Sequence, residues 1–328
     1  MKPLAVALGD PAGIGPEIVA AAWASRHGND LPPFFAIGDR RSIAAVWDGP
    51  VETLSAPSDA AAVFERALPL IQVDDPGDIV PGDPNLAGAR CALDSLEIAV
   101  GLARTGTAAG LVTGPVSKAQ LYAIGFTYPG QTEFIAERCG VSAGNVVMML
   151  AGPSLRAVPI TIHSALADVS RVLTTELIVT RARVTARGLQ RDFGIAAPRL
   201  SVAGLNPHAG EGGTLGREEI DIIAPAIEAL LAEGLEITGP HAADSMFHAD
   251  ARARYDVALC MYHDQALIPL KTLDFHDGVN VTLGLPIVRT SPDHGTAFGI
   301  AGTGSANPAA MIAAIRMAGQ CATRRCSG

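Results

Sequence analysis

Three histidines stand where a metal site could form, because each follows a short apolar run of the kind that makes a strand. They are His163, His208 and His263, which follow the runs 157–162, 200–205 and 257–262. In open α/β sheets, ligands bind beyond the carboxyl ends of the strands, so three such side chains could converge on one ion. Imidazole nitrogens suit zinc and similar divalent metals, and three protein ligands leave a position open for substrate. The alternative is three separate polar loop residues, because spacings this long form no metal signature.

A second group of polar residues lies in or beside apolar runs late in the chain: Lys271, Asn280 and Arg289. Arg289 follows Leu285–Val288, so we expect its guanidinium to emerge at a strand end. There it could bind a phosphate or carboxylate through two hydrogen bonds. The alternative for each of these residues is an ion pair on the solvated surface.

Glycine-rich turns are the third kind of candidate site, and they occupy residues 9–17, 208–213 and 293–297. None of them fits G-x-G-x-x-G after a strand with an acid about twenty residues on, and none fits the phosphate-binding G-x-x-x-x-G-K-[ST] pattern. The usual nucleotide fingerprints are therefore absent, and each turn by itself could be a plain tight connection.

The elements that must position these residues alternate between short apolar runs and longer amphipathic stretches. Expected strands are 4–8, 110–113, 146–150, 157–162, 200–205, 257–262 and 279–283. Ala92–Arg104 is expected to be a helix with one apolar face, and Arg217–Glu233 a second helix that begins late or bends at Pro225. The alternation predicts an α/β fold with a largely parallel sheet, and Asp74–Pro84 as a loop.

Composition narrows the class of protein further. Hydrophobic residues make up 48% of the 328 residues, which is ample material for a core and argues against a disordered chain. The net charge of -9, without a long basic run, makes nucleic acid an unlikely partner. Five scattered cysteines without C-x-x-C predict neither a disulfide framework nor a cysteine zinc site. We find no signal-peptide or membrane-span pattern, so the expected location is the cytoplasm.

Six motifs occur in order along the chain: GDPAGIGPE at 9–17, VTGPVSK at 112–118, GLNPHAGEGG at 204–213, YHDQ at 262–265, VNVTLGLP at 279–286 and RTSPDHGTA at 289–297. Together they resemble the 4-hydroxythreonine-4-phosphate dehydrogenase family of pyridoxine biosynthesis, from residue 1 to about residue 320. Several ordered motifs of this length make the resemblance highly specific.

The resemblance implies the fold of isocitrate and isopropylmalate dehydrogenases, with two α/β lobes around a cleft, in a homodimer. One lobe would comprise about residues 1–125 and 285–328 and carry the cofactor loop. The other would comprise about residues 126–284 and carry the metal ligands and the dimer interface. Residues 294–308 resemble the adenine-side cofactor loop of those dehydrogenases, which bind their dinucleotide without G-x-G-x-x-G.

Functional residues of the family match this sequence position by position. The implied ligands of a divalent metal (Zn, Mg or Co) are His163, His208 and His263, contributed across the dimer interface. Lys271, Asp244 and Asp264 are implied to act in catalysis, the two acids close to the metal. The implied substrate-binding residues are Gln131, Thr132, Lys271, Asn280 and Arg289. The implied cofactor-binding residues are His294, Gly295, Thr296, Ala297 and Asn307.

One position departs from the family pattern. The family usually has His before Thr132, whereas this chain has Gln131. Glutamine can donate a hydrogen bond, but it cannot carry a positive charge toward a phosphate. The departure therefore bears on the identity of the substrate.

The reaction implied by the resemblance is oxidation of 4-phosphooxy-L-threonine at C3, with hydride passing to NAD or NADP, followed by loss of carbon dioxide. A proton must also leave the hydroxyl, and Lys271, Asp244 and metal-bound water are the candidate acceptors. Two alternatives stay open. A sibling enzyme would oxidise a phosphorylated four-carbon sugar acid or an aromatic cis-dihydrodiol, and a non-catalytic binding protein would share only the fold.

A first prediction concerns the choice of cofactor. In the related decarboxylating dehydrogenases that use NAD, an acid typically stands two residues after the alanine of the adenine loop, where it repels the 2′-phosphate of NADP. That position is Gly299 in this chain. We therefore expect both NAD and NADP to be accepted, and Gly299→Asp to shift preference toward NAD by charge repulsion. Measuring kcat/KM with both cofactors checks this. A wild type that already rejects NADP by more than about a hundredfold, roughly 2.7 kcal/mol, would place the selectivity elsewhere.

Overall fold

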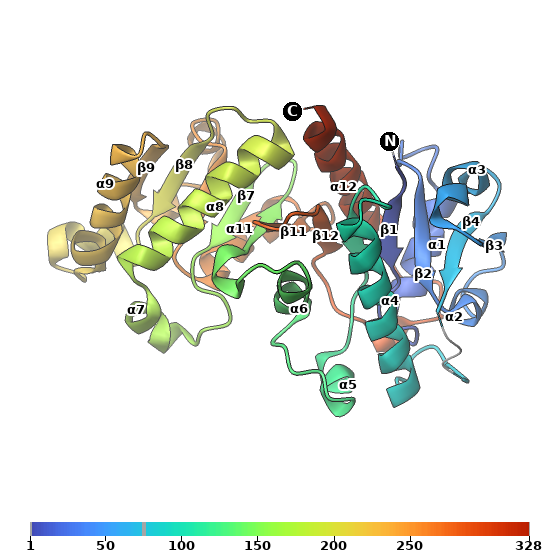
Figure 1. Ribbon diagram of the computed structural model, residues 1–328. Coiled ribbons are helices and arrows are strands. Elements are labelled where there is room, and N and C mark those ends of the chain that lie inside the picture. The colour runs from blue at the N-terminus through green and yellow to red at the C-terminus, as the bar shows by residue number, and fades with distance from the viewer. Residues whose placement is uncertain (1, 74–76, 328) are drawn as a thin grey trace. The chain divides into compact units, whose positions relative to one another are not determined.

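The computed structural model describes residues 2–73 and 77–327 and has the predicted α/β class, with two compact units (Figure 1). The first unit is the chain up to Gly140 together with Leu285–Ser327, and the second is Val141–Gly284. Residues 74–76 of the predicted loop 74–84 lie outside the described residues. Residues 77–84 contain an isolated bridge between Val80 and Asp83 and no helix.

The described residues of the first unit form six parallel strands in the order β3-β4-β2-β1-β5-β12. They are β1 (Leu4–Ala7), β2 (Phe34–Gly38), β3 (Val51–Thr53), β4 (Leu68–Gln72), β5 (Leu111–Thr113) and β12 (Arg289–Pro292). Every residue of β1 and β2 is buried, as expected for parallel strands with both faces covered. Burial on both faces explains why these strands appear in the sequence as continuous apolar runs.

Seven helices of the first unit are described: α1 (Gly15–Ala24), α2 (Arg40–Ala44), α3 (Ala60–Phe64), α4 (Leu86–Arg104), α5 (Lys118–Ala123), α6 (Gln131–Arg138) and α12 (Ala309–Ser327). Helix α4 confirms the helix predicted at 92–104 and begins six residues earlier. Its start is fixed by Asn85, whose side chain accepts a hydrogen bond from Gly88 N at 2.8 Å.

The second unit contains six strands in the order β11-β6-β7-β10-β8-β9. They are β6 (Val147–Ala151), β7 (Arg156–Pro159), β8 (Arg199–Ala203), β9 (Glu236–His241), β10 (Val257–Cys260) and β11 (Val279–Leu283). Strand β6 runs antiparallel to both β7 and β11, and the other pairings are parallel. Residues 152–155 between β6 and β7 are too few for a crossover, so these two strands must form a hairpin.

Described helices of the second unit are α7 (Val169–Val172), α8 (Thr175–Phe193), α9 (Ala224–Ala232), α10 (Ala249–Arg252) and α11 (His263–Leu273). The helix predicted at 217–233 is present, and it is irregular near Pro225 instead of beginning late, because its helical backbone already starts at Glu218. A π-helical turn at Glu219–Ile223 precedes α9, and Pro225 lies in the first turn of α9, where no helical N–H is needed. None of the described helices is long and apolar enough to cross a membrane.

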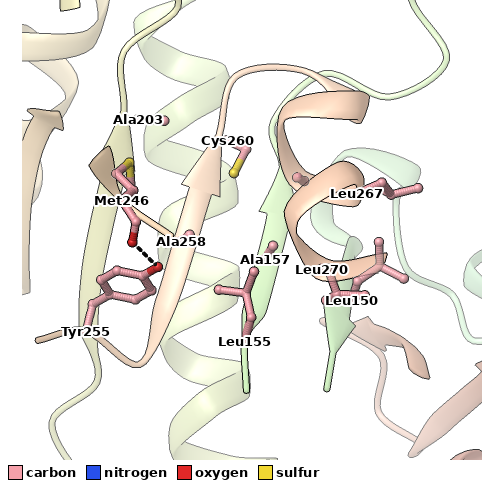
Figure 2. Packing of buried hydrophobic residues seen from close by; sticks show 11 residues of the cluster. Leu150, Leu155, Ala157, Ala203, Met246, Tyr255, Ala258, Cys260, Leu267 and Leu270 are labelled. Atoms are coloured by element: carbon pink, nitrogen blue, oxygen red, sulfur yellow. Dashed lines mark hydrogen bonds between the residues drawn. The ribbon is translucent and has the colours of Figure 1, made fainter. Parts of the chain in front are cut away.

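A buried apolar cluster fixes the positions of β7, β8, β10 and α11 in the second unit (Figure 2). Leu267 and Leu270 of α11 belong to this cluster together with Leu150 of β6 and Ala157 of β7. Tyr255 is also buried, and its hydroxyl donates to Met246 O at 2.9 Å. Helix α11 carries His263 at its first residue, so this packing also fixes one candidate metal ligand.

Candidate active site

His163 and His263 lie side by side in the second unit. Their ring centroids are 6.1 Å apart, and both residues line a cavity of about 260 Å³ together with Asp264 and Tyr262. His263 Nδ1 lies 2.7 Å from Asp264 Oδ1, so the ring donates this N–H to the carboxylate. A carboxylate on Nδ1 sets the tautomer of the ring and leaves Nε2 as the nitrogen that can bind a metal.

His208 lines a different cavity, of about 350 Å³, with Asn206, Asp244 and Tyr262. Tyr262 therefore borders both cavities, but His208 lines only the second of them and His163 and His263 only the first. Among residues 2–73 and 77–327 of this single chain, no group of three His, Cys, Asp or Glu side chains could hold a metal ion.

The backbone at two of the histidines is unusual. His163 has φ 53° and His208 has φ 51°, in the left-handed region that disfavours residues with a Cβ atom. His208 opens a run of six residues with positive φ that ends at Gly213. Each residue other than glycine in such a conformation costs about 1–2 kcal/mol. Backbone strain of this kind persists where surrounding contacts enforce it, often at functional sites.

Two buried polar side chains hold together the strand ends that carry the histidines. Thr161 Oγ1 donates to Met261 O at 2.7 Å, which joins the segment after β7 to the segment after β10. Gln265 accepts from Met261 N at 2.6 Å and donates to Gly204 O at 2.8 Å, which joins β10 to β8. Our sequence reasoning missed both residues. Gln265 had a signal, because it closes the YHDQ motif.

Lys271 and Asn280 also belong to the second unit. Lys271 is half-buried in the last turn of α11, and Asn280 lies within β11, opposite Leu150. Asn280 Oδ1 is buried and has no hydrogen-bond partner among the described residues. Because buried polar atoms are nearly always satisfied, this oxygen is suited to accept a hydrogen bond from a ligand.

Arg289, in the first unit, does not lie where the sequence analysis placed it. It is the first residue of β12 instead of following a strand, because the run 285–288 contains Pro286, which lacks an N–H for a strand ladder. The surface ion pair considered as its alternative is also wrong, since Arg289 is only 4% exposed. Desolvation lowers its pKa to about 10, opposed by the charge of Glu133, so the guanidinium stays protonated at neutral pH.

Gln131 contacts Arg289 directly. Arg289 Nη2 donates to Thr113 Oγ1 at 2.8 Å and to Gln131 Oε1 at 3.2 Å, while Gln131 Nε2 donates to Gly114 O at 3.2 Å. An acceptor at residue 131 therefore orients the buried guanidinium, which a protonated histidine would repel. Thr132 follows in the first turn of α6 and is half-buried.

Residues 294–308, the predicted cofactor loop, contact the glycine-rich turn at 9–17. Ile14 N donates to Thr296 O at 3.0 Å, and a Cβ on Gly13 would come within 3.0 Å of the same oxygen. The buried carboxylate of Glu17 accepts from Gly302 N at 3.2 Å and Ala306 N at 3.4 Å. The turn thus supports the loop, a role that its sequence alone did not indicate.

Within the loop, the predicted cofactor-binding residues differ in their surroundings. His294, Gly295 and Ala297 are exposed, and Ala297 has a left-handed φ of 44°. Asn307 Oδ1 accepts from Ala309 N at 2.9 Å, at the start of α12. A Cβ at Gly299 would meet nothing within 4 Å, so an aspartate side chain fits there.

These features define an α/β protein with candidate metal-binding and anion-binding groups beside parallel strands. The sequence profile described as "Pyridoxal phosphate biosynthetic protein PdxA" matches residues 32–318, and the chain belongs to this family. It is 59% identical to the 4-hydroxythreonine-4-phosphate dehydrogenase of Zymomonas mobilis over 99% of this chain and 97% of the relative.

Solved structures agree with this assignment. The 4-hydroxythreonine-4-phosphate dehydrogenase of Klebsiella pneumoniae superposes with a TM-score of 0.88 at 37% identity, covering 98% of each chain. A terephthalate 1,2-cis-dihydrodiol dehydrogenase from Burkholderia xenovorans superposes with a TM-score of 0.66 at 31% identity, over 97% of this chain and 98% of that one. The family resemblance stated from the motifs is confirmed.

Proposed function

We propose that this protein is a metal-dependent, NAD(P)-linked dehydrogenase of pyridoxal 5′-phosphate biosynthesis. Its substrate is 4-phosphooxy-L-threonine, which loses a hydride from C3 and a proton from the C3 hydroxyl. The resulting β-keto acid loses carbon dioxide, giving 3-amino-2-oxopropyl phosphate. The observation that carries the proposal is the pair His163 and His263, held side by side in a chain 59% identical over its length to a named enzyme of this activity.

The residues present fit a divalent metal. Three imidazoles favour zinc or cobalt over magnesium, which prefers oxygen ligands. Asp264 already orients His263 in the manner usual for metal-binding histidines. A bound ion supplies Lewis acidity, which lowers the pKa of the substrate hydroxyl and polarises the carbonyl that forms from it.

A homodimer would complete this metal site. His163 and His263 share one cavity of a chain and His208 lines another, so we propose that His208 comes from the partner subunit. Leu166, which borders the cavity of His163 and His263, is 70% exposed, and the same unit exposes Ile268 by 63% and Phe275 by 69%. Large apolar side chains exposed near a functional site are typical of a surface that a second copy covers.

The chain's own residues bind the substrate and move the proton. Arg289 is suited to the phosphate or carboxylate, because its buried guanidinium is fixed and charged. Asn280 and Thr132 would add hydrogen bonds to the polar groups of the substrate. Asp264 is engaged with His263, so the candidates for accepting the hydroxyl proton are Lys271 and Asp244.

Loop residues 294–297 and Asn307 are proposed to hold the dinucleotide, NAD or NADP, which accepts the hydride. The loop is fixed by hydrogen bonds from its backbone to the carboxylate of Glu17 and by the hydrogen bond from Ile14 N to Thr296 O. A loop fixed before binding loses little conformational entropy when the cofactor binds, and it sets the geometry for hydride transfer.

A cis-dihydrodiol dehydrogenase is the second candidate function. It is favoured by the solved dihydrodiol dehydrogenase at 31% identity and by Gln131, which carries no charge toward a phosphate. The assay that separates the candidates is dinucleotide reduction with 4-phosphooxy-L-threonine, erythronate 4-phosphate or an aromatic cis-dihydrodiol, each with and without chelator. We expect chelator-sensitive turnover with 4-phosphooxy-L-threonine to exceed that with the other two. A preference for either of the others would assign the protein to a sibling activity.

If the three histidines bind one ion, each substitution His163→Ala, His208→Ala and His263→Ala should abolish turnover. Each should also lower the affinity for zinc sharply, because two imidazoles hold the ion less well than three. Metal content by elemental analysis checks this, with the exposed His27 replaced by alanine as control. Full metal content in His208→Ala would remove that residue from the site.

A separate prediction concerns the anion-binding role of Arg289. Arg289→Lys keeps the charge but cannot form two parallel hydrogen bonds, so kcat/KM should fall about 10- to 100-fold, matching a lost charged hydrogen bond. The matched control is Arg66→Lys, at an exposed pair with Glu52 that should not affect turnover. An unchanged kcat/KM in Arg289→Lys would mean that Arg289 does not hold the substrate.

A further inference from the structure

The loop that carries His208 has a conformation that its own sequence does not favour. Residues 208–212 are all left-handed, and three of them, His208, Ala209 and Glu211, have side chains. Left-handed residues normally occur singly, so such a run must be held by contacts from outside it. Residues outside this run therefore help to determine the position of His208.

Glu219, the first residue of the π-helical turn, contacts the segment that leads into this run. Its side chain is buried, with 3% of the residue exposed. One carboxylate oxygen accepts from Asn206 N at 2.7 Å and the other from Asn206 Nδ2 at 3.0 Å. Both ends of Asn206, two residues before His208, are thus fixed by one buried carboxylate. Hydrogen bonds to an ionised acceptor are the strong ones.

Glycines leave the room that this arrangement requires. A Cβ on Gly210 would lie 2.6 Å from Glu219 Oε2, and one on Gly204 would lie 3.1 Å from Glu219 Oε1. A Cβ on Gly216 would lie 2.3 Å from Asn206 Nδ2. The backbone of the loop therefore packs closely against Glu219 and Asn206, and a glycine is present at each of these three positions.

Asn206 Nδ2 donates to a second carboxylate, Glu218 Oε2, at 2.7 Å. This hydrogen bond lowers the pKa of Glu218, which is therefore ionised at neutral pH. With two carboxylates facing it, the Asn206 amide can point only its NH₂ group toward them, because its oxygen would be repelled. The orientation of Asn206 is thus determined by the pair.

We propose that Glu219 is a positioning residue that holds the 206–216 loop in its left-handed form and so presents His208 to a divalent metal. The proposal rests on the proposed function, in which His208 is a metal ligand. Glu219 does not touch the metal or the substrate in this role. Its effect passes through Asn206 and the backbone of the loop.

Three variants test this role. In Glu219→Gln the carboxamide can accept from Asn206 N, but its NH₂ group then faces Asn206 Nδ2, donor against donor. Asn206 cannot turn over, because its oxygen would face ionised Glu218. Glu218→Gln is the matched control, since its amide oxygen can still accept from Asn206. In the double variant E218Q/E219Q, Asn206 can turn over and accept from both amides, so the hydrogen bonds are restored.

We expect zinc affinity, measured by competition with a chelating dye, to fall about 10- to 100-fold in Glu219→Gln, as for other residues that orient metal ligands. It should stay near wild type in Glu218→Gln and recover substantially in the double variant. Hydrogen exchange of the metal-free protein should quicken about tenfold at residues 206–216 in Glu219→Gln alone. KM for the dinucleotide should be unchanged, because Glu219 supports only the 206–216 loop, and the cofactor loop has its own support from Glu17.

Unchanged exchange at 206–216, or exchange quickened throughout the protein, would overturn the proposal. So would equal loss of zinc affinity in Glu219→Gln and in the double variant. A wild type that binds no divalent metal would instead contradict the proposed function, and the exchange of the metal-free loop would still decide whether Glu219 holds it.

Discussion

The side chain of Gln265 makes the contact on which the histidine sites depend most. It is buried, and it joins the ends of β10 and β8 by accepting from Met261 N and donating to Gly204 O. Losing one partner of such a buried pair leaves the other unsatisfied at a cost of about 1–3 kcal/mol. His263 and His208 follow the two strand ends that Gln265 joins. Thr161, two residues before His163, donates to Met261 O and so joins the end of β7 to the same place. The sequence pattern places the three histidines in loops. In the structure, a hydrogen bond at the preceding strand end fixes the position of each one.

In both units, loops with strained, left-handed backbone are contacted by buried side chains that hold them in place. The left-handed backbone at His163, at 208–212 and at Ala297 coincides with the loops that carry candidate ligand or cofactor residues. Buried carboxylates support two of these loops, Glu219 the one at 206–216 and Glu17 the one that contains Ala297. In each case the acid lies outside the loop and accepts from its backbone, Glu219 from Asn206 N and Glu17 from Gly302 N.

Much of the fold could be predicted from the sequence, because parallel strands with both faces buried appear as continuous apolar runs. Five of the described strands were not predicted: β2, β3, β4, β9 and β12. Strand β3 is only VET, and β4 and β9 contain prolines. Strand β2 is a fully buried apolar run, FFAIG, that the sequence analysis nevertheless left out. Arg289 was misplaced for a related reason: an apolar run was taken for a strand although Pro286 interrupts it. The pairing of His163 with His263 could not be derived from spacing, because it depends on the order of β7 and β10 in the sheet. For the same reason, the sequence could not show that His208 lines a different cavity from His163 and His263.

The central claim is that one metal site needs two subunits, with His208 supplied by the partner. A direct test is to unfold two variants, mix them and refold them together, so that mixed dimers form. His208→Ala mixed with His263→Ala should regain about a quarter of wild-type activity, because half of the randomly formed dimers are mixed and each has one intact site. His163→Ala mixed with His263→Ala should regain none, because both ligands come from the same subunit. If no mixture regains activity, or if His163→Ala with His263→Ala does, the proposed sharing of ligands is contradicted.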